Sequence, residues 1–257
     1  MSRAISLREL LEKEILSTPY YCVPLLPVGG RMVIGAPPKM KKSLLALNFA
    51  YSMAEGEPVL GLWQTARPLC VLIVEQEIGE VRLKERAGRI QRFRGGRLAP
   101  DNLYLISKDL EIQIDTKRGL EILVQEIEKV KPQVVILDPL RKMHQQKEED
   151  SQQMVYLFRC LDQIQRQFQL SMILVHHTTK RSEFRNLTNP EALRGSGEIF
   201  ADVDTAIMLE QPVQNRPERL RLHVKLRSDK DPEPVLVTMD PETFWFTVDA
   251  KKVAEEL

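Results

Sequence analysis

Short apolar runs alternate with longer segments of helical periodicity through the first two-thirds of the chain. The apolar runs predict strands at 31–35, 69–74, 103–107, 134–138 and 171–176. In the segments between them, apolar residues recur every three or four positions, which predicts helices. These helices cover 43–55 and the stretches around 78–94, 117–130 and 150–168. Such alternation of strand and helix is typical of α/β folds.

Two of the predicted strands are apolar at every position of 134–137 and 172–175. This pattern is typical of strands in a parallel sheet that is covered by helices on both faces. Beyond residue 203, four short strands are separated only by turns, at 205–209, 220–226, 234–239 and 244–248. We therefore expect an α/β fold whose mostly parallel central sheet has helices on both faces and is extended by antiparallel strands at the C-terminal end.

Composition narrows the class of protein without identifying it. The 257 residues are 43% hydrophobic, which suits one large globular domain. The formal net charge is +1, so nucleic-acid binding would need a local basic patch. The N-terminus is charged and no apolar run exceeds strand length, so we expect no signal peptide or membrane span. Cys22, Cys70 and Cys160 lack metal-ligand spacing, and we interpret them as free thiols in a reducing cytoplasm.

A candidate phosphate-binding loop lies between the first predicted strand and helix. Its members are Gly35, Ala36, Pro37, Pro38, Lys39, Met40, Lys41, Lys42 and Ser43. Such a loop needs converging backbone N–H groups, a lysine that reaches the phosphates and a hydroxyl that holds Mg²⁺. Lys42 and Ser43 supply the last two, although Ala36 and Lys41 stand where the standard motif has glycine. The alternative is a basic turn whose Ser43 caps the helix.

Two carboxylates follow predicted central strands. Asp138 ends the strand at 134–138, where it could hold Mg²⁺ beside a phosphate loop. Glu77 follows the strand at 69–74, where it could polarise an attacking water molecule. The alternatives are an ordinary strand-terminating aspartate and a solvated acidic loop, since Glu75 and Glu80 lie nearby.

Further polar residues occur at later strand ends. His177 directly follows the last central strand, where a polar side chain can sense the terminal phosphate; a strand-end histidine bonded to the backbone is the alternative. Lys225 and Arg227 alternate along a late strand, so their side chains share one side of it. Two cations there suit a phosphate-facing role across a subunit interface. Alternatively, they are surface cations that protect an edge strand.

The order and spacing of these motifs resemble the RecA-like ATPases, and most closely the RepA-type group of hexameric replicative helicases. The resemblance extends over 19–248. The segments that carry it are 23–50, 71–90, 137–144 with 148–154, 174–180 and 193–210, followed by the Lys-x-Arg at 225–227. It implies an N-terminal helical arm over 1–18, a RecA-like ATPase domain over 19–250 and a tail over 251–257. The predicted helix at 5–15 in that arm has one apolar face, which would pack on a neighbour or on its own core.

The resemblance implies ATP and Mg²⁺ as cofactors. Lys42 and the loop N–H groups would bind the phosphates, and Ser43 and, through water, Asp138 would hold Mg²⁺. Glu77 would position the attacking water, and His177 would contact the nucleotide. Arg227, with Lys225, would act on the site of a neighbouring subunit, so the active form would be a homo-oligomer, expected as a hexameric ring.

The resemblance also implies single-stranded DNA as a partner. Cations in two loops would line the ring's channel and grip the phosphates of a single strand. They are Arg141, Lys142, Lys180, Arg181, Arg185 and Arg194. The alternative is a pair of ordinary solvated loops. Replication or loader proteins would be further partners.

Three functions fit the sequence. The first is a ring motor of the replicative-helicase class that hydrolyses ATP and acts on single-stranded nucleic acid. The second is a non-processive RecA-like ATPase that serves as a regulatory switch or loader. The third is an ATP-binding module whose irregular phosphate loop supports little hydrolysis.

Overall fold

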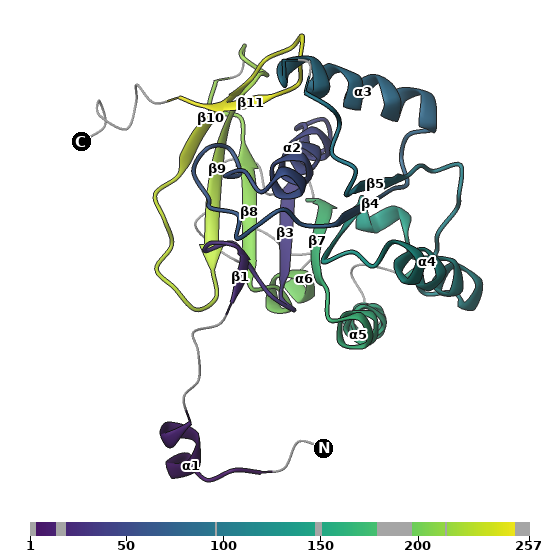
Figure 1. The fold of residues 1–257 in the computed structure, drawn as a ribbon, viewed down its shortest axis with the longest axis vertical. Coiled ribbons are helices and arrows are strands. Elements are labelled where there is room, and N and C mark those ends of the chain that lie inside the picture. Colours follow the sequence, from purple (N-terminus) through teal and green to yellow (C-terminus); the bar gives the residue numbers. More distant parts are fainter. Residues whose placement is uncertain are drawn as a thin grey trace.

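A nine-stranded sheet forms the centre of the molecule, with strand order β11-β10-β9-β8-β3-β7-β6-β4-β5 (Figure 1). The computed structural model describes residues 4–13, 19–95, 97–146, 151–178, 197–213 and 215–249. The strands of the sheet are β3 (Arg31–Ala36), β4 (Val71–Glu75), β5 (Leu103–Ile106), β6 (Val134–Asp138), β7 (Ser171–His177), β8 (Thr205–Glu210), β9 (Arg219–Leu226), β10 (Val235–Met239) and β11 (Phe246–Val248). A separate small hairpin pairs β1 (Tyr20–Cys22) with β2 (Leu26–Pro27).

Helices connect the parallel strands. They are α2 (Lys42–Glu55), α3 (Glu80–Phe93), α4 (Lys117–Val130), α5 (Ser151–Phe168) and α6 (Gly197–Ala201), together with a 3-10 turn at Leu140–Lys142. Each strand and helix predicted for residues 19–249 forms within two residues of its expected bounds. The α/β prediction, with a mostly parallel sheet and antiparallel strands at its C-terminal end, is confirmed.

One strand differs from its expected place. The turn-separated pattern places 205–209 among the antiparallel strands, but β8 pairs parallel with β3 and antiparallel with β9. The chain crosses back after β7, by a path that includes α6, so β8 begins at the same edge of the sheet as β3. The antiparallel part therefore begins only at β9.

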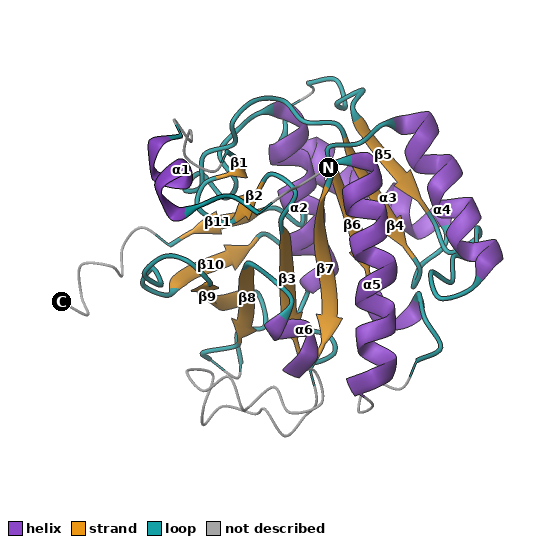
Figure 2. Cartoon of the chain, turned by 90° about the horizontal axis from the view of Figure 1, so that it is seen from below, coloured by secondary structure: helices purple, strands orange, loops and turns teal. Residues whose placement is uncertain are grey.

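The fully apolar strands contact two separate cores. On β6, Val134 and Ile136 pack into the core beneath α2, whereas Val135 and Leu137 pack into the core beneath α4 and α5. Figure 2 shows α5 and α6 on one face of the sheet and α2 on the other. Continuous apolarity along these strands is thus explained by burial on both faces.

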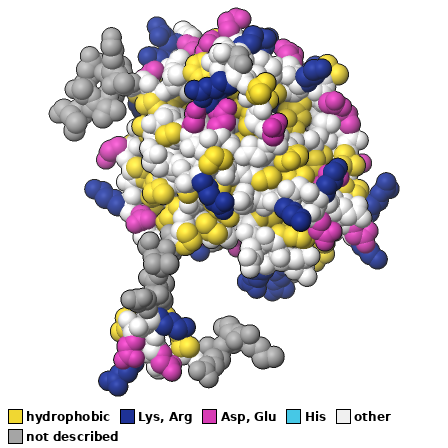
Figure 3. All heavy atoms as spheres, in the orientation of Figure 1, with side chains coloured by type: hydrophobic (Ala, Val, Ile, Leu, Met, Phe, Trp, Pro, Cys, Tyr) yellow, Lys and Arg dark blue, Asp and Glu magenta, His cyan; other side chains and the backbone are white. Residues whose placement is uncertain are grey.

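The surface carries both charge signs. On the face shown in Figure 3, Lys and Arg side chains are interspersed with Asp and Glu, in keeping with a net charge of +1. The three cysteines are free thiols, as expected. None of the helices in the described ranges is long and apolar enough to span a membrane.

The helix of the N-terminal arm is shorter than its pattern predicts. It is α1 (Leu7–Glu12), and it begins with a capping box in which Ser6 and Glu9 exchange side-chain-to-backbone hydrogen bonds. The helix has no buried residue, and Leu7 and Leu11 are 70% and 76% exposed. Its apolar face therefore does not pack on the core of its own chain within the described residues.

Substitution by alanine should have opposite effects on stability at two helical glycines. A Cβ at Gly119 in α4 would lie 2.6 Å from the carbonyl carbon of Gln113, whereas a Cβ at Gly88 in α3 would meet nothing within 4 Å. We expect Gly119→Ala to lower stability by about 2 kcal/mol, or roughly 4–8 °C in Tm. Gly88→Ala should raise stability by up to about 1 kcal/mol, because alanine favours helix. Thermal unfolding of both variants checks the packing of α4; a harmless Gly119→Ala would contradict it.

Candidate nucleotide-binding site

The candidate site lies at the carboxyl ends of the central parallel strands. The segment 37–41 joins β3 to α2, and β3 lies between β7 and β8. Asp138 is the last residue of β6 and His177 the last residue of β7. Ligands of open α/β sheets bind at this edge, because the loops there leave a crevice above the strand ends.

The loop has the backbone turn that its missing glycines would favour. Lys39 and Lys41 have φ of 67° and 58°, in the left-handed region that glycine adopts most readily. Lys41 stands where the standard motif has glycine, directly before α2. Its Nζ donates a hydrogen bond to the carbonyl of Pro217, 2.5 Å away, which ties the loop to the turn before β9. The chain therefore makes the turn without the glycine.

The predicted loop residues fall into two groups. Gly35 and Ala36 belong to β3, and Gly35 leaves room for Met208, whose Sδ would lie 2.8 Å from a Cβ at that position. Pro38 and Lys39 are exposed, whereas Met40 is half-buried against the core beneath α2. The Met40 side chain thus contributes packing to that core.

Lys42 is the first residue of α2 and is only 4% exposed. Its Nζ donates hydrogen bonds to the carbonyls of Ala36 and Pro37, at 2.8 and 2.9 Å, and lies 3.1 Å from Nδ1 of His177. Burial lowers the pKa of Lys42 to about 8, and Asp138 and Glu77 partly oppose this shift. The amine is therefore turned into the loop, among groups that phosphate oxygens could replace.

Oxygen donors gather beside Lys42. Ser43 Oγ donates a 3.0 Å hydrogen bond to Oδ1 of Asp138, and Glu75 pairs with Asp138 across β4 and β6. Both carboxylates are almost fully buried. Burial raises the pKa of Asp138 to about 8, with the charge of Glu75 adding to the effect, and burial also raises the pKa of Glu75.

This donor set fits Mg²⁺ in part. Hydroxyl and carboxylate oxygens are ligands that Mg²⁺ prefers, and nucleotide sites complete the shell with phosphate oxygens and water. No group of three or more His, Cys, Asp or Glu within the described ranges is placed to hold a metal alone. Ser43 and Asp138 are thus suited to an ion that arrives with a phosphate.

Glu75 is a residue whose role sequence reasoning missed. Its Oε1 accepts hydrogen bonds from the backbone N–H groups of Glu77 and Ile78, at 2.6 and 3.1 Å, and Arg86 lies 3.9 Å from its Oε2. Glu75 thereby shapes the turn that presents Glu77, which is exposed. Glu77 still lies within electrostatic range of Lys42 and Asp138. The strand-end position of Glu75, in register with Asp138, is a signal that could have identified it.

The Lys-x-Arg residues lie at the opposite edge of the sheet. Leu226, between them, pairs with Thr205, which pairs in turn with Met32 at the start of β3. Because β3 has six residues, about 20 Å separates this edge from the loop that follows β3. Lys225 and Arg227 therefore cannot reach the phosphate loop of their own chain.

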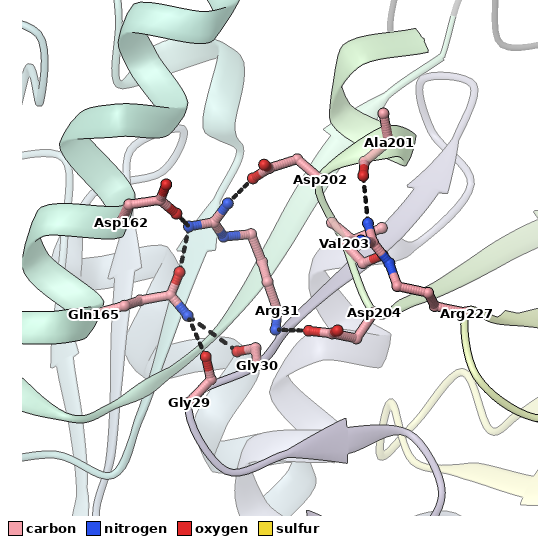
Figure 4. Close-up of polar contacts among 10 residues, drawn as sticks. All are labelled: Gly29, Gly30, Arg31, Asp162, Gln165, Ala201, Asp202, Val203, Asp204 and Arg227. Atoms are coloured by element: carbon pink, nitrogen blue, oxygen red, sulfur yellow. Dashed lines mark hydrogen bonds and ion pairs between the residues drawn. The ribbon is translucent and has the colours of Figure 1, made fainter. Parts of the chain in front are cut away.

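The two cations have different partners. Arg227 donates from Nε to the carbonyl of Val203, at 3.0 Å, and from its guanidinium to the carbonyl of Ala201 (Figure 4). Lys225 Nζ lies 2.6 Å from the carboxylate of Asp231. Lys225 lies within β9, whereas Arg227 directly follows its last residue, Leu226.

Only part of the predicted nucleic-acid surface can be placed. Arg141 and Lys142 are exposed on the 3-10 turn that follows β6. Arg141 donates a 3.3 Å hydrogen bond to the carbonyl of His144. The other four cations, Lys180, Arg181, Arg185 and Arg194, lie outside the described residues.

The raised pKa of Asp138 predicts a pH-dependent stability. Between about pH 4 and pH 8 the folded protein retains a proton that the unfolded chain releases, so stability falls as pH rises through this window. Asp138→Asn cannot ionise and should be more stable than the native chain at pH 8 without Mg²⁺, by at least about 1 kcal/mol, or roughly 2–4 °C. Thermal unfolding at pH 5 and pH 8 measures this, with the exposed Asp101→Asn as control. An equal pH response in all three proteins would contradict the shift.

Comparison with known proteins agrees with this geometry. A family model described as an AAA domain matches residues 4–183. No curated protein matches the sequence. Among solved structures, one described as an ATPase domain is 18% identical, with a TM-score of 0.62 and coverage of 85% of this chain and 84% of that one.

Two further structures share the fold. A DnaB-like replicative helicase, described with its interactions with primase, is 17% identical with a TM-score of 0.64; the match covers 86% of this chain and 57% of that one. The KaiC-like protein PH0186 from Pyrococcus horikoshii OT3 is 14% identical with a TM-score of 0.60, covering 89% and 93%. Because the family model spans more than half of the sequence, the chain belongs to the AAA-domain family of P-loop ATPases, with a RecA-like fold.

Proposed function

We propose that the protein hydrolyses ATP with Mg²⁺ at the carboxyl edge of its parallel sheet and works as a homo-oligomeric motor on single-stranded nucleic acid. One observation carries the proposal. A buried lysine amine and a serine bonded to a buried aspartate lie where β3 turns into α2, and an exposed glutamate lies within electrostatic range of the lysine and the aspartate. This is the set of groups that phosphoryl transfer to water requires.

Each group has a distinct role. Lys42 would exchange its hydrogen bonds to the carbonyls of Ala36 and Pro37 for bonds to phosphate oxygens. The negative charge of the phosphates would also raise the lowered pKa of Lys42 toward its normal value. Ser43 and Asp138 would hold Mg²⁺, which neutralises phosphate charge when bound. Glu77, exposed and held by the Glu75 turn, would orient the attacking water and accept its proton.

The base end of the nucleotide has a candidate platform. Phe244, in the turn between β10 and β11, has a φ of 58°, and the guanidinium of Arg89 lies 4.6 Å from the centre of its ring. Since β10 runs in the same direction as β3, this turn lies at the same edge as the phosphate loop. The ring is half-buried against the core and the guanidinium lies over it, so the two form a flat stacked pair on which a nucleoside base can stack in turn.

The proposal of an oligomer rests on the positions of the phosphate loop and the Lys-x-Arg residues at opposite edges of the sheet. Lys225 and Arg227 lie across the sheet from the phosphate loop of their own chain, so they could contact only the nucleotide of another copy. A head-to-tail contact of this kind repeats into a ring or an open filament, and we propose a closed ring of six copies. An arginine that reaches a transferred phosphate from outside typically adds about 10³–10⁵ in rate.

Single-stranded DNA is the proposed track. Arg141 and Lys142 are exposed on the turn that directly follows Asp138, so a nucleic-acid contact there adjoins the metal position. The DnaB-like relative is described as a replicative helicase that interacts with primase, which supports replication proteins as partners. A non-processive regulatory or loader ATPase is the alternative, favoured by the bonds of Arg227 within its own chain, which suit a resting state.

ATP turnover measured over a protein concentration series, with and without single-stranded DNA, tests the proposal. Turnover per subunit should rise with concentration and with DNA, and the stimulation should fall steeply between low and moderate salt. Lys42→Ala should bind ATP at least about tenfold more weakly by calorimetry, because a charge-assisted contact is lost. Unchanged affinity in Lys42→Ala would reject the phosphate-loop assignment. Turnover that ignores DNA would instead support the regulatory ATPase.

Removing Arg227 should separate binding from turnover. Arg227→Ala should bind ATP normally but lose about 10³-fold in turnover. Mixing it with Glu77→Gln should restore part of the activity, because some interfaces then join an intact Glu77 to an intact Arg227. Lys230→Ala, which removes an exposed cation nearby, is the matched control. Full activity of Arg227→Ala, or no rescue in the mixture, would exclude action between subunits.

A further inference from the structure

Asn48 connects the phosphate-loop helix to the turn that carries Phe244. It lies on α2, six residues after Lys42 and about 9 Å further along the helix axis. Its side chain is 1% exposed and makes three hydrogen bonds of 2.9 Å. Nδ2 donates to the carbonyls of Leu44 and Phe244, and Oδ1 accepts from the backbone N–H of Phe246. The amide thus holds the turn on both sides of Trp245.

These bonds act on a strained conformation. Phe244 has a φ of 58°, which is unusual for an aromatic residue and persists only where surrounding contacts impose it. The bond from Asn48 is made to the carbonyl of that same residue. Asn48 is therefore placed to hold the left-handed backbone that sets the direction of the Phe244 ring.

The turn is also attached to α3, but through other residues. Arg89 donates a 3.2 Å hydrogen bond to the carbonyl of Pro241, and its guanidinium lies over the Phe244 ring. Trp245 stacks on Phe93, with ring centres 4.9 Å apart. These contacts fix where the turn lies against α3, whereas Asn48 fixes it against the helix that begins with Lys42 and Ser43.

We infer that Asn48 is a positioning residue that sets the Phe244 ring at a fixed separation from the phosphate loop, so that the protein selects a nucleoside triphosphate over a bare polyphosphate. The inference rests on the proposed function. Phosphates would bind at the first turn of α2, and the base would stack on the Phe244–Arg89 pair, whose ring is held from the second turn. Because one buried helix carries both attachments, the distance between them cannot change without unpacking that helix.

Affinities for Mg²⁺ complexes of ATP and of tripolyphosphate, measured by calorimetry, test the inference. The native chain should bind ATP at least about tenfold more tightly, because only ATP has a base to stack. Asn48→Asp keeps an oxygen for the Phe246 N–H but loses the donor to Phe244. We expect it to lose about tenfold in ATP affinity and to keep tripolyphosphate affinity within about twofold. A purely structural residue would lower both affinities together, which would overturn the inference.

Two further variants make the outcome specific. Ser52→Ala is the matched control, since Ser52 is equally buried on α2 one turn beyond Asn48, and it should keep the native preference for ATP.

Phe244→Ala should lose the same preference as Asn48→Asp, and the double variant should lose no more than either single variant. An unchanged preference in Phe244→Ala would overturn the inference whether or not Asn48→Asp folds. If the native chain bound neither compound, the proposed function itself would fail; equal binding of both would overturn only the base platform and the role of Asn48.

Discussion

The burial of α2 is the constraint on which the candidate site depends. Residue 42 and all of residues 45–54 are buried, so the helix contacts its surroundings on every side rather than along one stripe. A helix packed in this way cannot shift without opening the core above β3 and β4. The lysine, the serine and the asparagine that it carries therefore keep fixed positions relative to Asp138 and to the turn after β10.

At the strand ends, this rigid framework holds ionisable groups whose charged forms lack counter-charges. The pKa of Lys42 is lowered and the pKa values of Asp138 and Glu75 are raised, so burial disfavours the charged form of all three groups. A triphosphate and a divalent cation would supply the missing counter-charges in one step. Such a site has more to gain from the two ligands together than from either alone, which is the behaviour expected of a site built for the Mg²⁺ complex.

Sequence patterns predicted the features that depend on local periodicity. The parallel strands, and the positions of Ser43 and Asp138 at one sheet edge, follow from apolar runs and from the rule that parallel strand ends meet. The left-handed lysines of the loop could not be predicted, because the motif there normally depends on glycine and a distant carbonyl, that of Pro217, holds Lys41. The bond between Asn48 and Phe244 joins residues 196 positions apart, and no local pattern indicates it. The parallel β8 also depends on a crossover that periodicity does not encode.

Two arginines at the opposite edge of the sheet differ in how readily they could exchange their present hydrogen-bond partners for others. Arg31 is 3% exposed and is bound by Asp162, Asp202 and Gln165, so breaking these contacts would leave a buried guanidinium without partners (Figure 4). Arg227 is exposed and is bound only by neutral carbonyls in the contacts that the structure describes. A hydrogen bond between a guanidinium and a phosphate is stronger than one to a neutral carbonyl. An exchange of partners on assembly would therefore be favourable for Arg227 and unfavourable for Arg31. The segment 201–204 would stay fixed by Arg31 while Arg227 turned outward, so assembly need not disturb the sheet.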